Sequence, residues 1–215
     1  MKRNKLFIGS RASKLALIYA NKVKNEISKH YNKEIIIKEI NTTGDNKIDI
    51  RLSELGGKGL FSKNIENELL NKNIDLAVHA LKDLPSFDTE GLVTNCFLKR
   101  NNSNEVMISN SNKKLNDLVP GSIVGTSSFR REFQLKRIRK DLNFKLIRGN
   151  VDTRIRKLKS GEYDAIILAK AGLSSLNLDK EITQEFSNND LIPSAGQGTI
   201  AVQCRKDDVE IIELL

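Results

Sequence analysis

The chain is poor in the residues that several common functional sites require. It contains no tryptophan, 5% of its residues are aromatic, and its cysteines and histidines are limited to Cys96, Cys204, His30 and His79. Neither cysteine lies in a CxxC motif, and a zinc site needs more ligands than this set offers. We therefore exclude disulfide, zinc and haem-attachment frameworks, predict no bound metal, and expect both cysteines to be reduced.

The chain also lacks a long apolar run. After a short basic start, Leu6–Gly9 is too brief for the apolar region of a signal peptide, and nothing approaches the length of a membrane span. With 215 residues, 39% of them hydrophobic and 29% charged, the chain can bury one large core or two small ones. We expect a globular, cytoplasmic monomer that has no membrane partner.

Positive charge is present in excess. A formal net charge of +9 would suit nucleic acid, an anionic membrane or small acidic ligands. The lysines are spread over predicted helices and turns without interleaved aromatic residues, so nucleic-acid bases would find little to stack on. Nucleic-acid binding is therefore a rival hypothesis that would reveal itself by steep salt dependence, and we favour a small acidic ligand.

Arginines gather after two predicted strand ends that are each marked by a glycine. The arginines are Arg130, Arg131, Arg148 and Arg154. A glycine lets backbone N–H groups turn toward a ligand, a helix start adds partial positive charge, and guanidinium groups bind carboxylates through paired hydrogen bonds. The pattern predicts a ligand with several carboxylates or phosphates. The alternative is that these arginines decorate solvated helix faces.

Apolar periodicity predicts the order β-α-β-α-β twice, on either side of a polar stretch at residues 99–104. The predicted strands cover residues 6–9, 34–41, 74–78, 122–125, 144–147 and 164–169. Helices are predicted at residues 16–27, 61–69, 129–139 and 153–159. Two α/β lobes of the same design follow from this order.

The two halves also resemble each other in sequence. Ile8–Arg11 is similar to Val124–Ser127, and Asp75–Ala80 to Asp164–Ala169, each at the corresponding strand. The repeat fits an α/β fold with two lobes of periplasmic-binding-protein-like (type II) design, a hinge, and a cleft at the carboxyl ends of the strands, although any two βαβ units share some likeness. We predict a first lobe of residues 1–98 plus 199–215, a second lobe of residues 104–192, and hinge segments at 99–103 and 193–198.

Two further segments carry candidate chemistry. Gly57, Lys58 and Gly59 precede a predicted helix in a loop that could wrap a ligand or close as a lid, but their spacing is not that of a nucleotide-binding P-loop. Lys82 and Asp83 follow the third strand, where both charges would point toward the predicted cleft. Taken alone, Asp83 could equally form a surface salt bridge with Lys82 or cap a helix.

Seven segments, in this order, resemble the porphobilinogen deaminase (hydroxymethylbilane synthase) family. They are Ile8–Arg11, Gly56–Phe61, Ala77–Pro85, Gly125–Arg131, Arg148–Arg154, Tyr163–Ala169 and Ala195–Gly198. The resemblance spans nearly the whole chain. It implies a transferase of tetrapyrrole and haem biosynthesis that condenses four porphobilinogen molecules into hydroxymethylbilane with release of ammonia. It also implies a dipyrromethane cofactor, held covalently by a cysteine in the family.

The resemblance assigns roles to individual residues. Asp83 matches the catalytic aspartate, which also contacts the cofactor. It would stabilise the cation left when porphobilinogen loses ammonia, and we favour this role over proton donation. The other candidates would hold carboxylates. The carboxylates of the cofactor would be bound by Lys82, Ser128, Arg130 and Arg131. The carboxylates of the substrate and growing chain would be bound by Arg11, Arg148 and Arg154.

The chain departs from the family pattern in two ways. Glu54, Ala80 and Ser175 stand where relatives often carry lysine, serine and arginine, which weakens the expected hold on longer intermediates. The family's third, small α+β domain and its anchor cysteine are expected to be missing, because Cys96 and Cys204 match other positions and are expected to be small buried hydrophobes. Without that domain the resemblance does not imply the complete reaction, and the alternative is a non-catalytic two-lobed binding module for small polycarboxylates.

Overall fold

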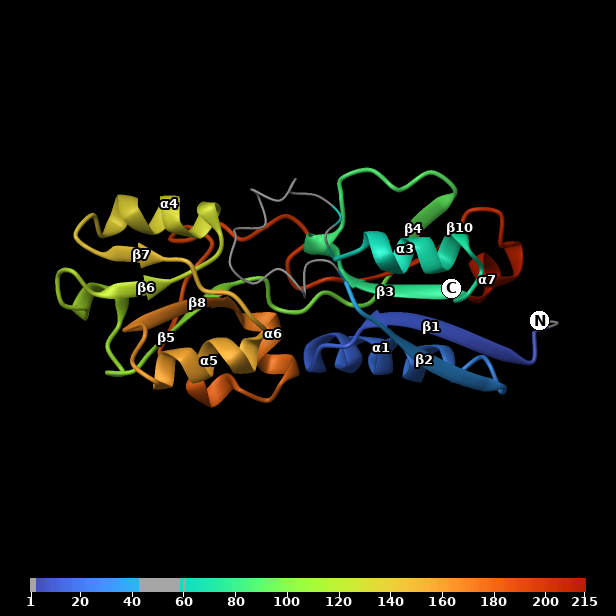
Figure 1. Ribbon diagram of the computed structural model, residues 1–215, viewed down its shortest axis with the longest axis horizontal. Coiled ribbons are helices and arrows are strands. Elements are labelled where there is room, and N and C mark those ends of the chain that lie inside the picture. Colours follow the sequence, from blue (N-terminus) through green and yellow to red (C-terminus); the bar gives the residue numbers. More distant parts are fainter. Residues whose placement is uncertain (1–2, 43–58, 60) are drawn as a thin grey trace. The chain divides into compact units, whose positions relative to one another are not determined.

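The computed structural model describes residues 3–42, 59 and 61–215. These residues form two compact units. Unit 1 contains residues 3–42, 59, 61–100 and 199–215, whereas unit 2 contains Asn101–Gly198. Within the described residues, the chain therefore leaves unit 1 once and returns to it, and each unit is built around one five-stranded sheet (Figure 1).

The sheet of unit 1 is mixed. In order across the sheet, its strands are β2 (Glu34–Ile40), β1 (Lys5–Arg11), β3 (Leu76–Ala80), β10 (Ile200–Arg205) and β4 (Leu92–Phe97). β1 pairs in parallel with both β2 and β3, and β10 runs antiparallel between β3 and β4. The carboxyl ends of β1, β2 and β3 consequently share one edge, at which β10 begins.

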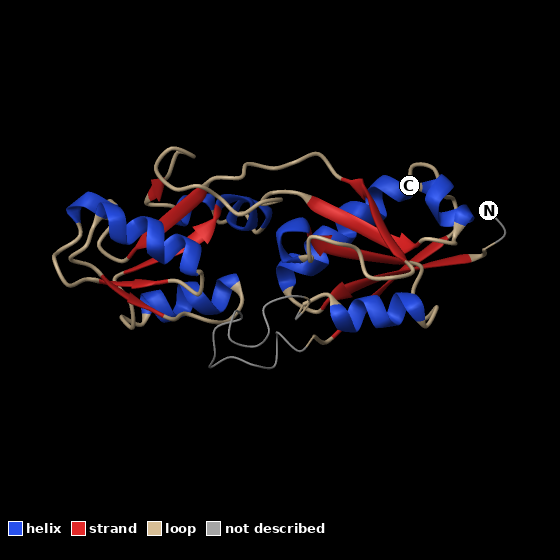
Figure 2. Ribbon diagram, turned by 90° about the horizontal axis from the view of Figure 1, so that it is seen from above, coloured by secondary structure: helices blue, strands red, loops and turns tan. Residues whose placement is uncertain are grey.

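Helices cover both faces of this sheet (Figure 2). α1 (Lys14–Ile27) and α7 (Val209–Leu214) pack on one face, α3 (Lys63–Leu70) packs on the other, and the short 3-10 helix η2 (Leu81–Asp83) follows β3. α1 begins where Ser13 Oγ accepts a hydrogen bond of 3.3 Å from the Ala16 N–H. This cap satisfies one of the N–H groups that a helix start leaves without an internal partner.

Unit 2 repeats this plan. Its strands, in order across the sheet, are β7 (Asn143–Lys145), β6 (Ile123–Gly125), β8 (Ala165–Ala169), β5 (Glu105–Ser109) and β9 (Gln184–Glu185). β6 pairs in parallel with β7 and β8, while β5 is antiparallel to β8. Its helices are α4 (Phe129–Ile138) on one face, α5 (Val151–Lys159) and α6 (Lys170–Ser175) on the other, and the 3-10 helices η3 (Leu115–Asp117) and η4 (Asp179–Glu181).

The repeat noticed in the sequence has a counterpart in hydrogen bonding. In unit 1, the Phe7 N–H donates to Asp75 Oδ2 at 2.9 Å and the Asp75 N–H donates to the Phe7 carbonyl at 2.8 Å. In unit 2, the Ile123 N–H donates to Asp164 Oδ2 at 2.7 Å and the Asp164 N–H donates to the Ile123 carbonyl at 2.9 Å. An equivalent aspartate, Asp75 in unit 1 and Asp164 in unit 2, thus joins the first and third parallel strands of each unit at their amino ends.

Matching glycines complete the repeat. A Cβ atom on Gly9 would lie 2.3 Å from Ile74 Cδ1, and one on Gly125 would lie 2.8 Å from Tyr163 Cδ1. Ile74 and Tyr163 each immediately precede the aspartate of their unit. Glycine is therefore required by close side-chain packing at both positions, not by the backbone conformation.

Two segments connect the units, and they are hydrogen-bonded to each other. The Leu98 N–H donates to the Ile200 carbonyl at 3.0 Å, the Asn101 N–H donates to the Gly198 carbonyl at 2.8 Å, and Gln197 Nε2 donates to the Ser103 carbonyl at 2.7 Å. The hinge role of residues 99–103 and 193–198 stays a prediction.

The predicted α/β fold is confirmed. Each predicted strand and helix is present, with ends shifted by at most two residues. The list of predicted strands did not include β4 and β10, which complete the sheet of unit 1, or β5 and β9, which complete the sheet of unit 2. Among the helices in the described ranges, none combines the length and apolar character needed to cross a membrane.

Candidate active site

The candidate site residues lie at the carboxyl edges of the two sheets. In unit 1, Arg11 is the last residue of β1, and Lys82 and Asp83 form the turn after β3. In unit 2, Arg130 lies in the first turn of the helix after β6, and Arg148 follows β7. Open α/β sheets bind ligands at this edge, so the topology supports the sequence-based choice of residues.

In unit 1, the aromatic ring of Phe61 fixes Arg11. The guanidinium carbon of Arg11 lies 4.1 Å from the centroid of the Phe61 ring, a cation–π contact that holds the charge beside an apolar surface. Lys82 and Asp83 are half-buried in η2.

A buried histidine lies just before this turn. His79 is 7% exposed, and its Nε2 atom has no hydrogen-bond partner among the described residues. Burial lowers the pKa of His79 to about 4, and the nearby side-chain amide of Gln203 offsets this only in part. The imidazole is therefore neutral in the folded protein at neutral pH.

This lowered pKa predicts a pH-dependent loss of stability. Because the folded state protonates His79 only near pH 4 and the unfolded state near pH 6.5, the unfolded chain binds more protons in between, and stability falls as the pH drops through this window. His79→Gln should remove about 2 kcal/mol of the stability difference between pH 7 and pH 5. Urea unfolding at both pH values measures this difference. His30→Gln, at an exposed site, is the control, and equal pH dependence in all three proteins would contradict the prediction.

In unit 2, two arginines share one buried carboxylate. Glu105 is fully buried at the start of β5, and Arg131 Nη2 donates to its Oε2 at 2.7 Å. Arg130 Nη2 donates to its other oxygen, Oε1. The two guanidinium groups hold the pKa of the Glu105 carboxyl below its usual range although burial opposes this. With Glu105 ionised, the cluster of Glu105, Arg130 and Arg131 carries a net charge of +1.

A second cluster of charged residues lies at the edge of unit 1 at which its parallel strands begin. Arg205, which is buried, pairs with Asp208 at 2.6 Å and with Asp75 at 3.5 Å, and Arg3 pairs with both of these acids and with Glu210.

Loop and helix geometry positions the other candidates in unit 2. Ser128 caps α4, because its Oγ accepts a hydrogen bond of 3.4 Å from the Arg131 N–H. Arg148 is buried just before Gly149, whose φ of +107° a side chain would strain. Arg154 Nε donates to the Gly149 carbonyl at 2.8 Å, which fixes the loop that carries Arg148.

Both cysteines are poorly suited to covalent attachment of a cofactor. Cys204 is fully buried, and burial raises the pKa of its thiol to about 11. Cys96 is half-buried, burial raises the pKa of its thiol as well, and its Sγ lies 3.8 Å from the Leu215 carbonyl oxygen. A thiol with a raised pKa supplies little thiolate at neutral pH, which agrees with the assignment of both residues as buried hydrophobes.

Part of the predicted lid loop lies outside the described residues. Gly57, Lys58 and the family departure at Glu54 fall in this range, whereas Gly59 is described and has a φ of +77°. The other two departures, Ala80 and Ser175, lie at the end of β3 and the end of α6. Lys170, the first residue of α6, pairs with Glu185. Asn104 also donates a hydrogen bond to Glu185.

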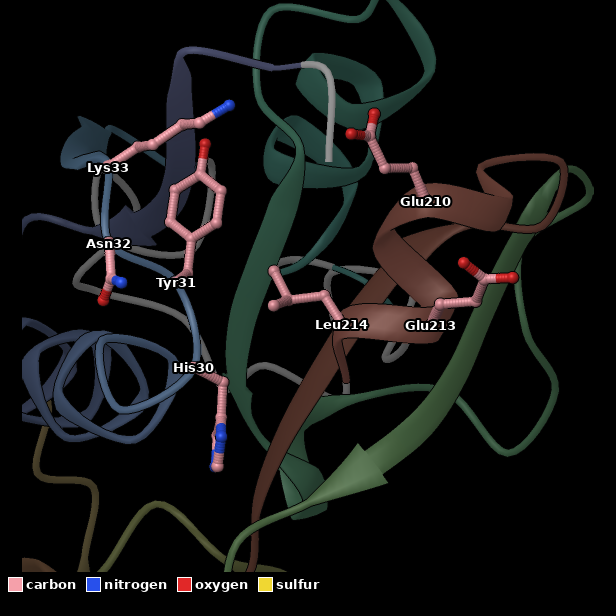
Figure 3. A pocket seen from close by; sticks show the side chains of 7 residues that line it. All are labelled: His30, Tyr31, Asn32, Lys33, Glu210, Glu213 and Leu214. Atoms are coloured by element: carbon pink, nitrogen blue, oxygen red, sulfur yellow. The ribbon is translucent and has the colours of Figure 1, made fainter.

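A pocket of about 400 Å³ in unit 1 is lined by none of the candidate site residues (Figure 3). Residues of the connection from α1 to β2 line one side of it and residues of α7 line the other, namely His30, Tyr31, Asn32, Lys33, Glu210, Glu213 and Leu214. This pocket lies at the amino edge of the sheet of unit 1, since β2 begins at Glu34. Because ligands of such sheets bind at the carboxyl edge, we do not assign the pocket as the active site.

The sequence analysis missed two residues that position the candidates. Phe61 was noted within a glycine-rich segment but not as the partner of Arg11, and Glu105 was not considered at all. A signal for Glu105 did exist, since a single acid opens the apolar run Glu105–Ser109. An acid that begins a buried strand requires a cation nearby.

The fold places the chain in a known class. An ancestral cationic amino acid solute binding protein matches 99% of this chain and 87% of its own length with a TM-score of 0.60 and 12% identity. The effector-binding domain of BenM with its effector benzoate matches 98% of this chain and 88% of its own length with a TM-score of 0.57 and 14% identity. The chain therefore has the two-lobed α/β fold of periplasmic-binding-protein-like proteins.

Sequence similarity then identifies the family. Residues 6–213 match the family model described as "Porphobilinogen deaminase, dipyromethane cofactor binding domain". The porphobilinogen deaminase of Bacillus pumilus (strain SAFR-032) is 49% identical over 212 residues, which are 97% of this chain and 68% of the relative. That of Lysinibacillus sphaericus (strain C3-41) is 47% identical over 213 residues, 98% of this chain and 69% of the relative.

The chain belongs to the porphobilinogen deaminase family, as the resemblance of its motifs indicated. Members of this family are transferases of tetrapyrrole and haem biosynthesis, and dipyrromethane is the family's cofactor.

Proposed function

We propose that unit 2 binds the carboxylates of pyrrole compounds and that Asp83 of unit 1 stabilises the charge that develops during porphobilinogen condensation. The observation that carries this proposal is the Glu105 cluster, in which two arginines meet a single carboxylate at the carboxyl edge of the sheet. Every pyrrole of the substrate and product bears an acetate and a propionate. One further carboxylate would neutralise the cluster.

The residues present fit a dipyrromethane, whose rings also carry carboxylates. Arg130 and Arg131 supply the guanidinium groups, Ser128 supplies a hydroxyl at the start of α4, and Lys82 supplies a point charge. Arg131 Nε is buried and has no hydrogen-bond partner within the described ranges, so it retains an unused donor. When bound, dipyrromethane supplies the primer to which pyrrole units are added.

Substrate carboxylates are assigned to a second set of arginines. Arg148 and Arg154 lie on the loop fixed by the Gly149 carbonyl, and Arg11 lies against Phe61. Arg11 and Arg154 are held by these contacts and Arg148 is buried before a ligand arrives, which lowers the entropy lost on binding. Arginine forks at fixed positions would hold the acidic side chains and leave the reacting ring carbon accessible.

Asp83 is assigned to the chemical step. Loss of ammonia from porphobilinogen leaves a cation on the substrate, and a fixed carboxylate near the pyrrole nitrogen lowers the energy of this cation electrostatically. The same carboxylate can accept the proton that the ring loses when it regains aromaticity. A binding module for polycarboxylates would need the arginines but not this acid.

We further propose that the protein acts in the cytoplasm as a monomer on a small-molecule substrate, without nucleic acid or membrane as a partner. The scarcity of aromatic residues supports the absence of a base-stacking surface. The charge of +9 is then explained by ligand carboxylates.

The carboxylate assignment is tested by conservative substitution. Arg130→Lys, Arg131→Lys and Arg148→Lys keep the charge but lose the paired geometry, and each should weaken binding of porphobilinogen or free dipyrromethane by about 1–3 kcal/mol. Isothermal titration calorimetry measures the affinity. Arg137→Lys is the matched control, because this arginine is exposed on the same helix, α4. Unchanged affinity in all three variants would mean that these arginines are solvated or structural and do not bind ligand carboxylates.

A further inference from the structure

Glu105 is a fully buried acid that no motif of the sequence singles out. Its two carboxylate oxygens are divided between two arginines, with Oε1 accepting from Arg130 Nη2 and Oε2 accepting from Arg131 Nη2 at 2.7 Å. The inference below rests on the proposed function of these two arginines as carboxylate ligands.

The sheet places Glu105 at the carboxyl edge although it is the first residue of its strand. β5 is antiparallel to β8, and Glu105 is level with Ala169, the last residue of β8. β5 is paired on its other side with β9. The backbone that carries Glu105 is therefore held from both sides, so its carboxylate is a fixed reference point next to the start of α4.

Each arginine is tied down at a second point as well. Arg131 Nη1 donates to the Ile167 carbonyl at 3.0 Å, and Arg130 Nη1 donates to the Ile192 carbonyl. Gln134 fixes Ile192 in turn, accepting from its N–H at 2.8 Å through Oε1 and donating to its carbonyl at 3.2 Å through Nε2. Both terminal nitrogens of each guanidinium thus have protein partners, and the plane of each group is determined.

This arrangement leaves donors available in fixed directions. A guanidinium has five N–H bonds, and each arginine uses two of its nitrogens on the protein. Arg131 Nε is buried without a hydrogen-bond partner in the part of the chain that the structure describes. An arginine side chain is flexible when it is not held, so fixing two of them beforehand reduces the entropy that a ligand must overcome.

We propose that Glu105 is a positioning residue for carboxylate binding. It orients Arg130 and Arg131 as a pair while the cluster keeps a net charge of +1, which attracts a ligand carboxylate. Glu105 itself does not touch the ligand. Its effect is transmitted through the two arginines.

The decisive variant is Glu105→Asp, which keeps the charge but is one methylene shorter, so that it cannot reach both guanidinium groups from the same backbone position. We expect the affinity for free dipyrromethane, measured by isothermal titration calorimetry, to fall about tenfold. Glu105→Gln removes the charge and should weaken binding further, but it leaves the buried Arg131 and the half-buried Arg130 without an anion and can fail to fold. Thermal unfolding monitors the fold of both variants, and Glu105→Asp carries the test if Glu105→Gln does not fold.

Glu185→Gln is the matched control. Glu185 also pairs with a cation, Lys170, and lies on the strand next to β5, but it does not contact Arg130 or Arg131. Its replacement should leave dipyrromethane affinity unchanged. An equal loss of affinity in Glu105→Asp and Glu185→Gln would show a general disturbance of unit 2 and would overturn the positioning role.

A mutant cycle between Glu105 and the arginine pair separates positioning from mere structural support. If Glu105 acts through both arginines, adding Glu105→Asp to the variant that carries Arg130→Lys and Arg131→Lys should weaken binding little further. An additional loss of about tenfold, as independent effects would give, would contradict the proposal. Wild-type affinity in Glu105→Asp overturns the positioning role alone, whereas failure of the wild-type chain to bind dipyrromethane overturns the proposed function together with it.

Discussion

In a protein joined to the third domain of a relative, Asp83→Asn should lower the rate of porphobilinogen consumption by a factor on the order of 10² or more while ligand binding stays nearly intact. The substitution keeps the size and hydrogen-bonding reach of the side chain but removes its charge. Only the cationic stage of the reaction depends on that charge, because the arginines bind the ligand carboxylates. The rate is followed by release of ammonia, and affinity by calorimetry with porphobilinogen.

The expectation has a control in the same loop. Asp88 Oδ1 accepts a hydrogen bond of 2.7 Å from Thr94 Oγ1, a structural contact at an exposed position, and Asp88→Asn should keep the wild-type rate. A purely structural Asp83 would behave in the reverse way, with a modest loss of thermal stability and an unchanged rate. Near-normal turnover in Asp83→Asn would remove Asp83 from the mechanism.

Local sequence signals were sufficient to predict much of the fold. The run of isoleucines predicted β2, and the helical spacing of Ala16, Ala20, Val23 and Ile27 predicted α1, in which the last three of these residues are buried. Gly9 and Gly125 could be recognised as a pair because the repeat places them at matching strands, and the structure adds the reason, a side chain that covers each glycine. Such features depend on neighbours close in the chain or on repetition.

The residues that the sequence did not reveal depend on contacts between distant segments. Glu105 meets Arg130 and Arg131 across 25 and 26 residues, and no spacing rule predicts that an acid after the polar linker will be aligned with the end of β8. β5 itself reads poorly as a strand, because all five of its residues are buried and it shows no alternation. The arginines could be predicted from their turns, but their orientation could not.

The same limit applies to the segments that join the units. The motif Ala195–Gly198 was recognised from its resemblance to the family. The physical need for its last glycine appears only when the other connecting segment, which carries Asn101, is seen beside it. Gly198 has a φ of +87°, and a Cβ atom there would lie 2.5 Å from the carbonyl oxygen of Asn101. The contact is with backbone, which cannot move aside as a flexible side chain would.

Gly198→Ala should therefore be among the most destabilising single substitutions in the chain. Strain in the left-handed region and the clash with Asn101 together predict a loss of about 2–5 kcal/mol, seen as a fall of roughly 5–15 °C in the midpoint of thermal unfolding. The hydrogen bond from the Asn101 N–H to the Gly198 carbonyl, 2.8 Å long, would be disturbed as well. Differential scanning calorimetry measures the midpoint.

Gly161→Ala separates the two causes. Gly161 has nearly the same backbone conformation, with a φ of +84°, but a Cβ atom there would meet nothing within 4 Å. Its replacement carries the conformational strain alone, about 1 kcal/mol, so the additional loss in Gly198→Ala measures the close approach of the two connecting segments. Equal losses in the two variants would mean that the segments separate easily to admit a side chain, and the close pairing at Gly198 would then contribute nothing to the stability of the fold.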